Sequence, residues 1–164
     1  MKARYTIGGV AKTISFDFGL EGTGRRNGFS LSLLEKVFQL VLAEGGASAN
    51  VYTNRPKSFA TNVSNFIVSS MQGSIEDMAT YGECVMNIAL FAKDAAGFKN
   101  SNKLSVMQDA VFGSLPLAVS VTDDSGALVG EYLIDQHPDI VGDAPDDYGF
   151  HCRMILFRVT IKVI

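Results

Sequence analysis

The sequence has 164 residues, of which 47% are hydrophobic and 19% are charged, with a formal net charge of −3 at pH 7. This composition excludes a disordered chain, and the slight negative charge excludes a generally basic surface that would attract nucleic acid. No apolar run approaches the roughly 18 residues of a membrane span, and no signal peptide follows Met1. We therefore expect one domain, residues 1–164, made in the cytoplasm.

The first part of the chain predicts a β-hairpin followed by a helix. Residues 2–7 and 13–18 alternate apolar and polar side chains around a Gly-Gly pair, which predicts two paired strands with one solvated face. Ser32 begins the pattern Ser-Leu-Leu-Glu, a capping box that predicts the start of a helix. A second Gly-Gly pair at 45–46 predicts its end. The apolar stripe of this helix consists of Leu34, Val37, Phe38, Val41 and Leu42.

Two segments carry the basic residues that we expect at an interface. Residues 21–28 form a glycine-rich loop with Arg25 and Arg26. This loop lacks the Lys-Ser/Thr of a phosphate-binding P-loop and the spacing of a dinucleotide fingerprint. We therefore expect a connector, or a loop that contacts an acidic partner, rather than a phosphate cradle. Arg55 and Lys57 lie in a second break of the chain.

The centre of the chain predicts a buried strand that runs into a helix. From residue 83 to residue 93 both alternating sets of side chains are largely apolar, which is typical of a strand covered on both faces. Shorter strands are expected at 49–52 and 65–71, and residues 74–77 could cap a short helical turn. The helix that follows the central strand ends at Pro116. Its apolar stripe consists of Leu104, Met107, Val111 and Leu115.

The remaining apolar runs predict a closing set of strands. Residues 117–122 and 128–134 alternate on either side of a turn at 123–126. The last run, from 148 to 164, changes phase near Ile155, so that apolar side chains before and after this point face opposite sides. A bulge, or a strand that changes its buried face, would explain the change.

The most polar segment, residues 135–147, is predicted to be an acidic loop, because it contains two prolines and five aspartates. The aspartates are Asp135, Asp139, Asp143, Asp146 and Asp147. His137 lies between the first two, so a small ligand- or metal-binding domain that uses this loop is the alternative function. A solvated acidic loop is the simpler interpretation.

No residue pattern predicts catalysis. Cys84 and Cys152 lie within apolar strand patterns, which favours reduced core thiols over a disulfide or a catalytic nucleophile. We predict no catalytic residue, no cofactor and no metal ligand. An unfamiliar hydrolase or nuclease would need perturbed ionisable groups in a cleft, which a sequence does not reveal. Basic and aromatic side chains interleave only in the last strand, so we expect no specific nucleic-acid contact.

These elements together predict an α+β fold. It would consist of a mixed, mostly antiparallel sheet with two principal helices packed on one side, plus the N-terminal β-hairpin. No internal repeat and no domain linker is evident, so the fold would be a single domain.

From about residue 30 onward, the elements follow an order shared by a known family. The segments that carry the likeness are the strand 50–52, the Arg-Pro break at 55–56, the runs 66–70 and 87–94, the helix with Leu104, Met107 and Val111, and the closing hairpin. This order resembles the tail-terminator, tail-completion and neck proteins of tailed bacteriophages. The likeness is one of pattern, without a catalytic motif, and it leaves the N-terminal hairpin unmatched.

The resemblance implies a non-enzymatic virion protein that joins the phage tail tube to the head. Such proteins form rings, commonly hexamers, and their partners are further copies, the tail tube and head–tail connector proteins. The protein would reach the virion tail or neck after assembly in the host cytoplasm, with no membrane involved. Ring contacts would come from loops and edge strands. The matching residues are Arg25, Arg26, Arg55 and Lys57 on basic segments and Asp135, Asp139, Asp143, Asp146 and Asp147 on the acidic loop. Opposite charges on the two kinds of loop could meet head to tail between neighbours.

Overall fold

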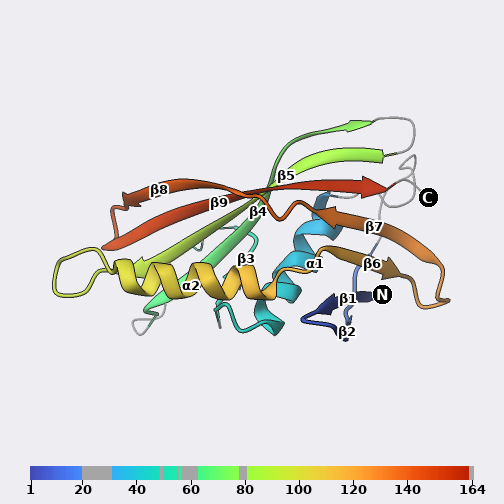
Figure 1. Cartoon of the computed structure of the whole chain (residues 1–164), viewed down its shortest axis with the longest axis horizontal. Helices are drawn as coiled ribbons and strands as arrows, with labels where there is room; N and C mark the ends of the chain where they lie inside the picture. The colour runs from blue at the N-terminus through green and yellow to red at the C-terminus, as the bar shows by residue number, and fades with distance from the viewer. Residues whose placement is uncertain (20–30, 49, 55, 57–62, 78–80, 163–164) are drawn as a thin grey trace.

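The computed structural model describes residues 1–19, 31–48, 50–54, 56, 63–77 and 81–162. Its main feature is one large curled sheet (Figure 1). The described part contributes nine strands, in the order β2-β1-β6-β7-β9-β5-β4-β3, with β8 paired to β9 beside β7. The strands are β1 (Lys2–Ile7), β2 (Val10–Ser15), β3 (Val51–Tyr52), β4 (Asn65–Asp77), β5 (Tyr81–Lys93), β6 (Ala118–Thr122), β7 (Leu128–Ile134), β8 (Asp139–Pro145) and β9 (Phe150–Lys162). The β3–β4 pair is parallel and the other pairs are antiparallel, so the sheet is mixed.

The predicted α+β class is wrong, because strands take up 51% and helices only 20% of the described residues. The fold is dominated by its sheet. Three strands of 13 residues, β4, β5 and β9, lie side by side and account for much of the excess. The predicted helical turn at 74–77 is part of β4, whose pairing with β5 continues to residue 77 after an irregularity. The predicted acidic loop contains β8. Polar residues suggested a helix cap at 74–77, and prolines and aspartates suggested a loop at 135–147, but a solvated edge strand tolerates such residues.

The N-terminal hairpin is confirmed, with Gly8 and Gly9 at positive φ in its turn. The two expected helices are also present, as α1 (Leu31–Glu44) and α2 (Ser101–Ser114). The capping box is wrong, because α1 already includes Ser32. The carboxylate of Glu35 instead accepts a hydrogen bond from the backbone N–H of Met71 in β4, at 3.0 Å. This bond joins the helix to the sheet.

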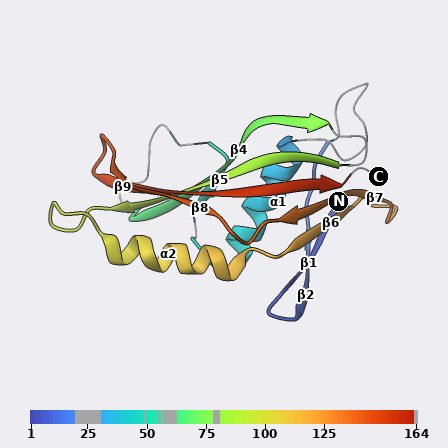
Figure 2. The ribbon, with the colours of Figure 1, turned by 45° about the horizontal axis from the view of Figure 1, so that its top comes forward.

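Two groups of apolar side chains lie on opposite faces of the sheet. The larger core packs both helices against one face of the sheet (Figure 2). On this face Ile88 of β5 pairs with Ile155 of β9, and both are buried. The smaller cluster lies on the other face and contains Phe66, Phe91 and Phe150. These positions explain the phase change in the last strand. The register between β9 and β5 is continuous, so β9 changes its buried face without a bulge against β5.

Candidate interaction surface

Asp143 is held inside the structure and does not project as part of an acidic loop. Arg153 donates to its carboxylate from Nε and Nη2 at 2.6 and 2.9 Å, and Lys99 Nζ lies 3.0 Å from Oδ2. The Asp143 side chain is only 8% exposed. Its pKa is lowered to about 2, chiefly because Arg153 hydrogen-bonds to the charged form, while burial opposes the shift. This cluster joins β8 to β9 and to the loop before α2.

Two other predicted aspartates stabilise turns. Asp146 Oδ1 accepts hydrogen bonds from the backbone N–H groups of Tyr148 and Phe150, at 2.7 and 3.0 Å. Asp135 Oδ1 accepts from the backbone N–H of His137 at 2.9 Å, and this bond is the main reason that the pKa of Asp135 is lowered. Both arrangements are Asx turns, in which a side chain replaces a backbone acceptor.

Asp139 and Asp147 remain as the exposed carboxylates of this segment. Neither forms a hydrogen bond or an ion pair with another described residue, and both are classed with the exposed surface. Asp139 begins β8, where Ile140 and Val141 are 50% and 41% exposed. Of the five predicted aspartates, the structure therefore leaves Asp139 and Asp147 accessible to a partner, and Asp135 in part.

The predicted basic residues Arg25, Arg26, Arg55 and Lys57 lie outside the described residues. Their pairing with the acidic segment therefore stays a prediction. The structure draws attention instead to basic residues in the N-terminal hairpin.

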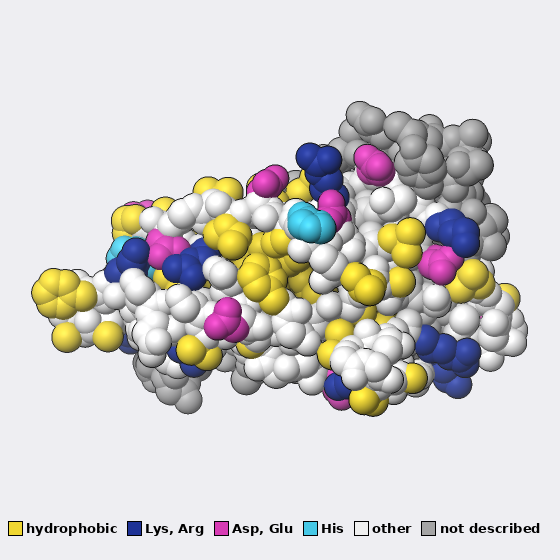
Figure 3. Space-filling model, viewed as in Figure 1, with side chains coloured by type: hydrophobic (Ala, Val, Ile, Leu, Met, Phe, Trp, Pro, Cys, Tyr) yellow, Lys and Arg dark blue, Asp and Glu magenta, His cyan; other side chains and the backbone are white. Residues whose placement is uncertain are grey.

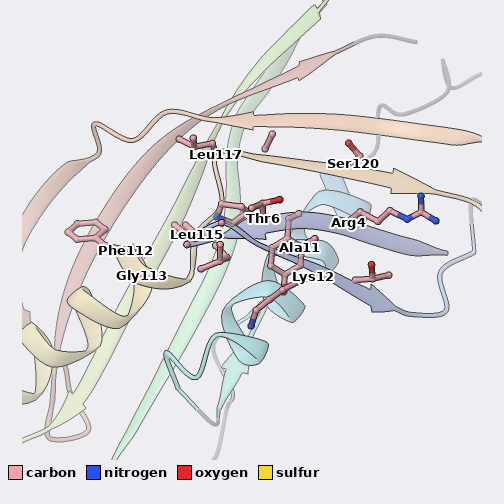
Figure 4. Close-up of a pocket in the computed structure, with 16 residues that line it drawn as sticks. Arg4, Thr6, Ala11, Lys12, Phe112, Gly113, Leu115, Leu117 and Ser120 are labelled. Atoms are coloured by element: carbon pink, nitrogen blue, oxygen red, sulfur yellow. The ribbon is translucent and has the colours of Figure 1, made fainter.

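A groove of about 660 Å³ lies between the β1–β2 hairpin, the C-terminal end of α2 and the start of β6 (Figure 4). It forms because β1 is longer than its ladder with β6. That ladder covers Lys2 to Tyr5, whereas the ladder with β2 continues to Ile7. The chain between α2 and β6 diverges from β1 at this point and forms the opposite wall.

The groove combines basic and apolar side chains, and none of the described residues that line it is a carboxylate. Arg4 and Lys12 contribute its charge, and neither pairs with a carboxylate of another described residue. Phe112 and Leu117 contribute exposed apolar surface, at 37% and 68% exposure. Phe112 also packs edge-on against buried Phe157, with ring centroids 6.1 Å apart. The groove is therefore suited to a ligand that is both acidic and apolar.

Exposed apolar residues extend from this groove toward the acidic segment. Figure 3 shows hydrophobic side chains gathered where α2 lies next to the β8–β9 strands. Ile140 faces the helix side of the sheet here, because it pairs with Ile155 of the larger core. Leu133 of β7 is a further exposed residue, at 45%. Exposed apolar surface of this kind often marks a contact with another protein.

A histidine–carboxylate pair is the nearest approach to a catalytic arrangement. His151 Nδ1 lies 2.6 Å from Asp94 Oδ1, and both side chains are about one-fifth exposed. A catalytic triad would also need a nucleophile within reach of the ring. The positions paired with His151 on either side are Ala92 and Pro145, and neither is a nucleophile. The pair links β9 to the end of β5.

Cys84 and Cys152 form no disulfide with each other and lie on opposite faces of the sheet, in agreement with the expected reduced thiols. Burial raises the pKa of Cys84 to about 11, which makes it a poor nucleophile. Within the described ranges, no three His, Cys, Asp or Glu side chains are grouped as metal ligands would be. In the same residues, neither helix is long and apolar enough to cross a membrane.

Comparison with known proteins gives no match to a family model and no match to a curated protein.

The groove was missed in the sequence because its residues come from segments far apart in the chain. A signal was nevertheless present. Residues 1–16 contain Lys2, Arg4 and Lys12 but no aspartate or glutamate. In a chain of net charge −3, this local excess of cations indicates a site for an acidic partner.

Proposed function

We propose that this chain is a non-enzymatic structural protein of a tailed bacteriophage, a ring-forming tail terminator or neck component that joins the tail tube to the head. The observation that supports this proposal most is the pair of complementary surfaces on one chain. One is the groove, which Arg4 and Lys12 line without any described carboxylate, and the other is the β8 edge, where Asp139 is exposed. Surfaces of this kind allow copies to associate through opposite charges.

The free edge of β8 adds to this support. β8 pairs with β9 on one side, and no described strand pairs with its other side. Residues 139–145 also form no backbone hydrogen bond outside that ladder with the described part of the chain. An open strand edge presents unpaired N–H and C=O groups to another chain. Its exposed apolar side chains make it suitable as a contact in an assembly.

The alternative, a ligand- or metal-binding site in residues 135–147, is less well supported. Asp143 already has two cationic partners, and Asp146 accepts backbone hydrogen bonds. A cation at this segment would have to compete with Arg153 and Lys99 for the same oxygens. The local contacts therefore favour a surface for protein contacts over an ion site.

The proposed partners are further copies of the chain in a hexameric ring, the phage tail tube and head–tail connector proteins. Assembly would take place in the host cytoplasm, and the finished ring would belong to the virion tail or neck. The resemblance in element order supplies these partners, and the exposed surfaces supply plausible places of contact.

The test is binding of the purified chain to isolated phage tail tubes, followed by co-sedimentation and electron microscopy. We expect the chain to sediment with the tubes and to be seen at one tube end. The sides of the same tubes provide the internal control. A chain that stays in the supernatant, or that coats the sides without preference for an end, would contradict a terminator role.

A further inference from the structure

We infer that the groove between the β1–β2 hairpin and α2 binds the acidic β8 edge of a second copy of this chain. This inference deepens the proposed function, on which it rests, because it names the contact between neighbouring copies. It also replaces the predicted contact through the undescribed basic loops with one built from described residues.

The groove and the β8 edge carry opposite charges. Arg4 and Lys12 are the charged residues that line the groove, and no carboxylate lines it with them. Asp139 is an exposed carboxylate at the start of β8 and has no partner among the described residues. Arg4 pairs with Thr13 and Lys12 with Tyr5 across the hairpin, so the two cations lie on its opposite faces. Contact would pair Asp139 with one of them, and the described part of each chain leaves both groups unneutralised.

In both surfaces, a charged side chain lies close to exposed apolar side chains. In β8 the carboxylate of Asp139 is followed at once by exposed Ile140 and Val141. In the groove the cations come from the hairpin, and Phe112 and Leu117, which are also exposed, lie on the opposite wall. Asp139 and Ile140 point to opposite faces of β8, as successive residues of a strand do. A segment that enters with Asp139 toward one cation of the hairpin would therefore turn Ile140 toward the apolar wall on the other side of the groove. Burying both apolar surfaces would contribute to affinity.

The backbones of β1 and β8 both have a stretch of strand edge without a described strand partner. Thr6 and Ile7 lie beyond the end of the β1–β6 ladder, so that side of β1 has no strand partner there in the described part of the chain. The outer edge of β8 is open in the same sense. A short stretch of main-chain pairing between the two edges would add specificity to the contact.

The contact must form between copies, because neither element can reach the other within one chain. β8 is fixed to the same edge of β9 as β7, β1 is fixed between β2 and β6, and strands β6 and β7 lie between β1 and β9. No residue of β8 lines the groove of its own chain. Each copy therefore has one groove and one β8 edge to offer to neighbours.

The test is a charge swap followed by light scattering. Asp139→Lys and at least one of Arg4→Glu and Lys12→Glu should weaken self-association about 100-fold, because each of these changes places like charges together. Arg4→Glu or Lys12→Glu combined with Asp139→Lys should restore the wild-type mass in at least one combination. Lys2→Glu on β1 and Asp109→Lys on α2 are matched controls, because they make the same charge changes at exposed residues outside the groove and β8. Circular dichroism confirms that each variant is folded.

The outcomes separate the groove contact from the proposed function. If the three single reversals leave the mass unchanged, or if neither combination restores a lost assembly, the groove contact is wrong while the ring can stand. If assembly follows the charges but stops at two copies, or if the assembled ring ignores tail tubes, the groove contact holds and the phage role fails. A wild-type chain that is monomeric at every concentration, both alone and in the presence of tail tubes, overturns both.

Discussion

Two pairs of basic side chains on this molecule differ in whether a carboxylate lies beside them. Next to β8, Arg153 and Lys99 share the carboxylate of Asp143, and Arg153 also donates to Gln108 Oε1 at 3.1 Å. In the groove, Arg4 and Lys12 lie beside apolar side chains with no carboxylate in the lining.

This difference distinguishes charged side chains that stabilise the fold from charged side chains that can bind a partner. A buried carboxylate needs its cations, because without them it would be a charge removed from water and left uncompensated. A cation beside a groove that is open to water stays hydrated, so it does not need a carboxylate within its own chain and remains available to a partner. Substitutions of Asp143 and its cationic partners should therefore change the free energy of unfolding, whereas substitutions in the groove should change the association of copies.

The largest effect on stability is expected from Asp143→Ala. Removing one partner of a buried ion pair costs about 3 kcal/mol or more, because Arg153 would keep a half-buried charge with no carboxylate. Urea unfolding measures the loss. Asp139→Ala, which removes an exposed carboxylate from the same strand, should change the free energy of unfolding by less than about 0.5 kcal/mol. Equal losses for the two variants would contradict the distinction drawn here.

The next effect is a dependence of stability on pH. The pKa of Asp143 is about 2 in the folded chain, below its ordinary value of 3.8. A carboxyl with a lowered folded pKa contributes stability above its unfolded pKa and loses that contribution as the pH falls through the folded value. Unfolding between about pH 5 and pH 2 should therefore show a loss of about 2 kcal/mol that Asp143→Asn lacks. A wild-type and an Asn variant with parallel pH profiles would exclude this assignment.

A smaller effect is expected from Lys99→Ala. The Lys99 side chain is 41% exposed, so its attraction to Asp143 is screened by water. An exposed pair of this kind contributes about 0.5 kcal/mol. Urea unfolding in low and high salt should show a small loss that disappears as salt is added. A loss as large as that of Asp143→Ala would mean that Lys99, and not Arg153, is the main partner.

The smallest effect on stability is expected from Arg4→Ala and Lys12→Ala in the groove. Neither cation has a described carboxylate partner, so the free energy of unfolding should stay within about 0.5 kcal/mol of the wild-type value. The measurement belongs at a chain concentration low enough to exclude self-association, because assembly adds to apparent stability. A loss above about 1 kcal/mol would show that the groove cations also have a structural role.

Much of the core could be predicted from the sequence, because periodicity reports burial directly. The stripe of α1 and the apolar residues of β5 are buried as expected, from Phe38 and Val41 to Met86 and Ile88. The fold class could not be predicted in the same way. β8 contains Gly142 and Asp143 at an irregularity in its pairing, and it ends at Pro145. Those residues are typical of loops, and only the partner strand β9 makes the segment a strand.

The candidate interface was less predictable than the core. The charge pattern identified the acidic segment, yet it could not show that Asp143 pairs with Arg153 across a strand pair. The groove brings together Arg4 and Phe112, which lie more than one hundred positions apart in the chain. Contacts of that separation depend on strand order, and no local pattern specifies strand order.

The most direct test of the central claim is the mass of the purified chain in solution, measured by multi-angle light scattering over a range of concentrations. The proposal that this protein works as a ring predicts a species of about six times the 17.6 kDa of one chain, formed alone or on contact with tail tubes. A strict monomer at every concentration, with no species formed in the presence of tubes, would contradict it.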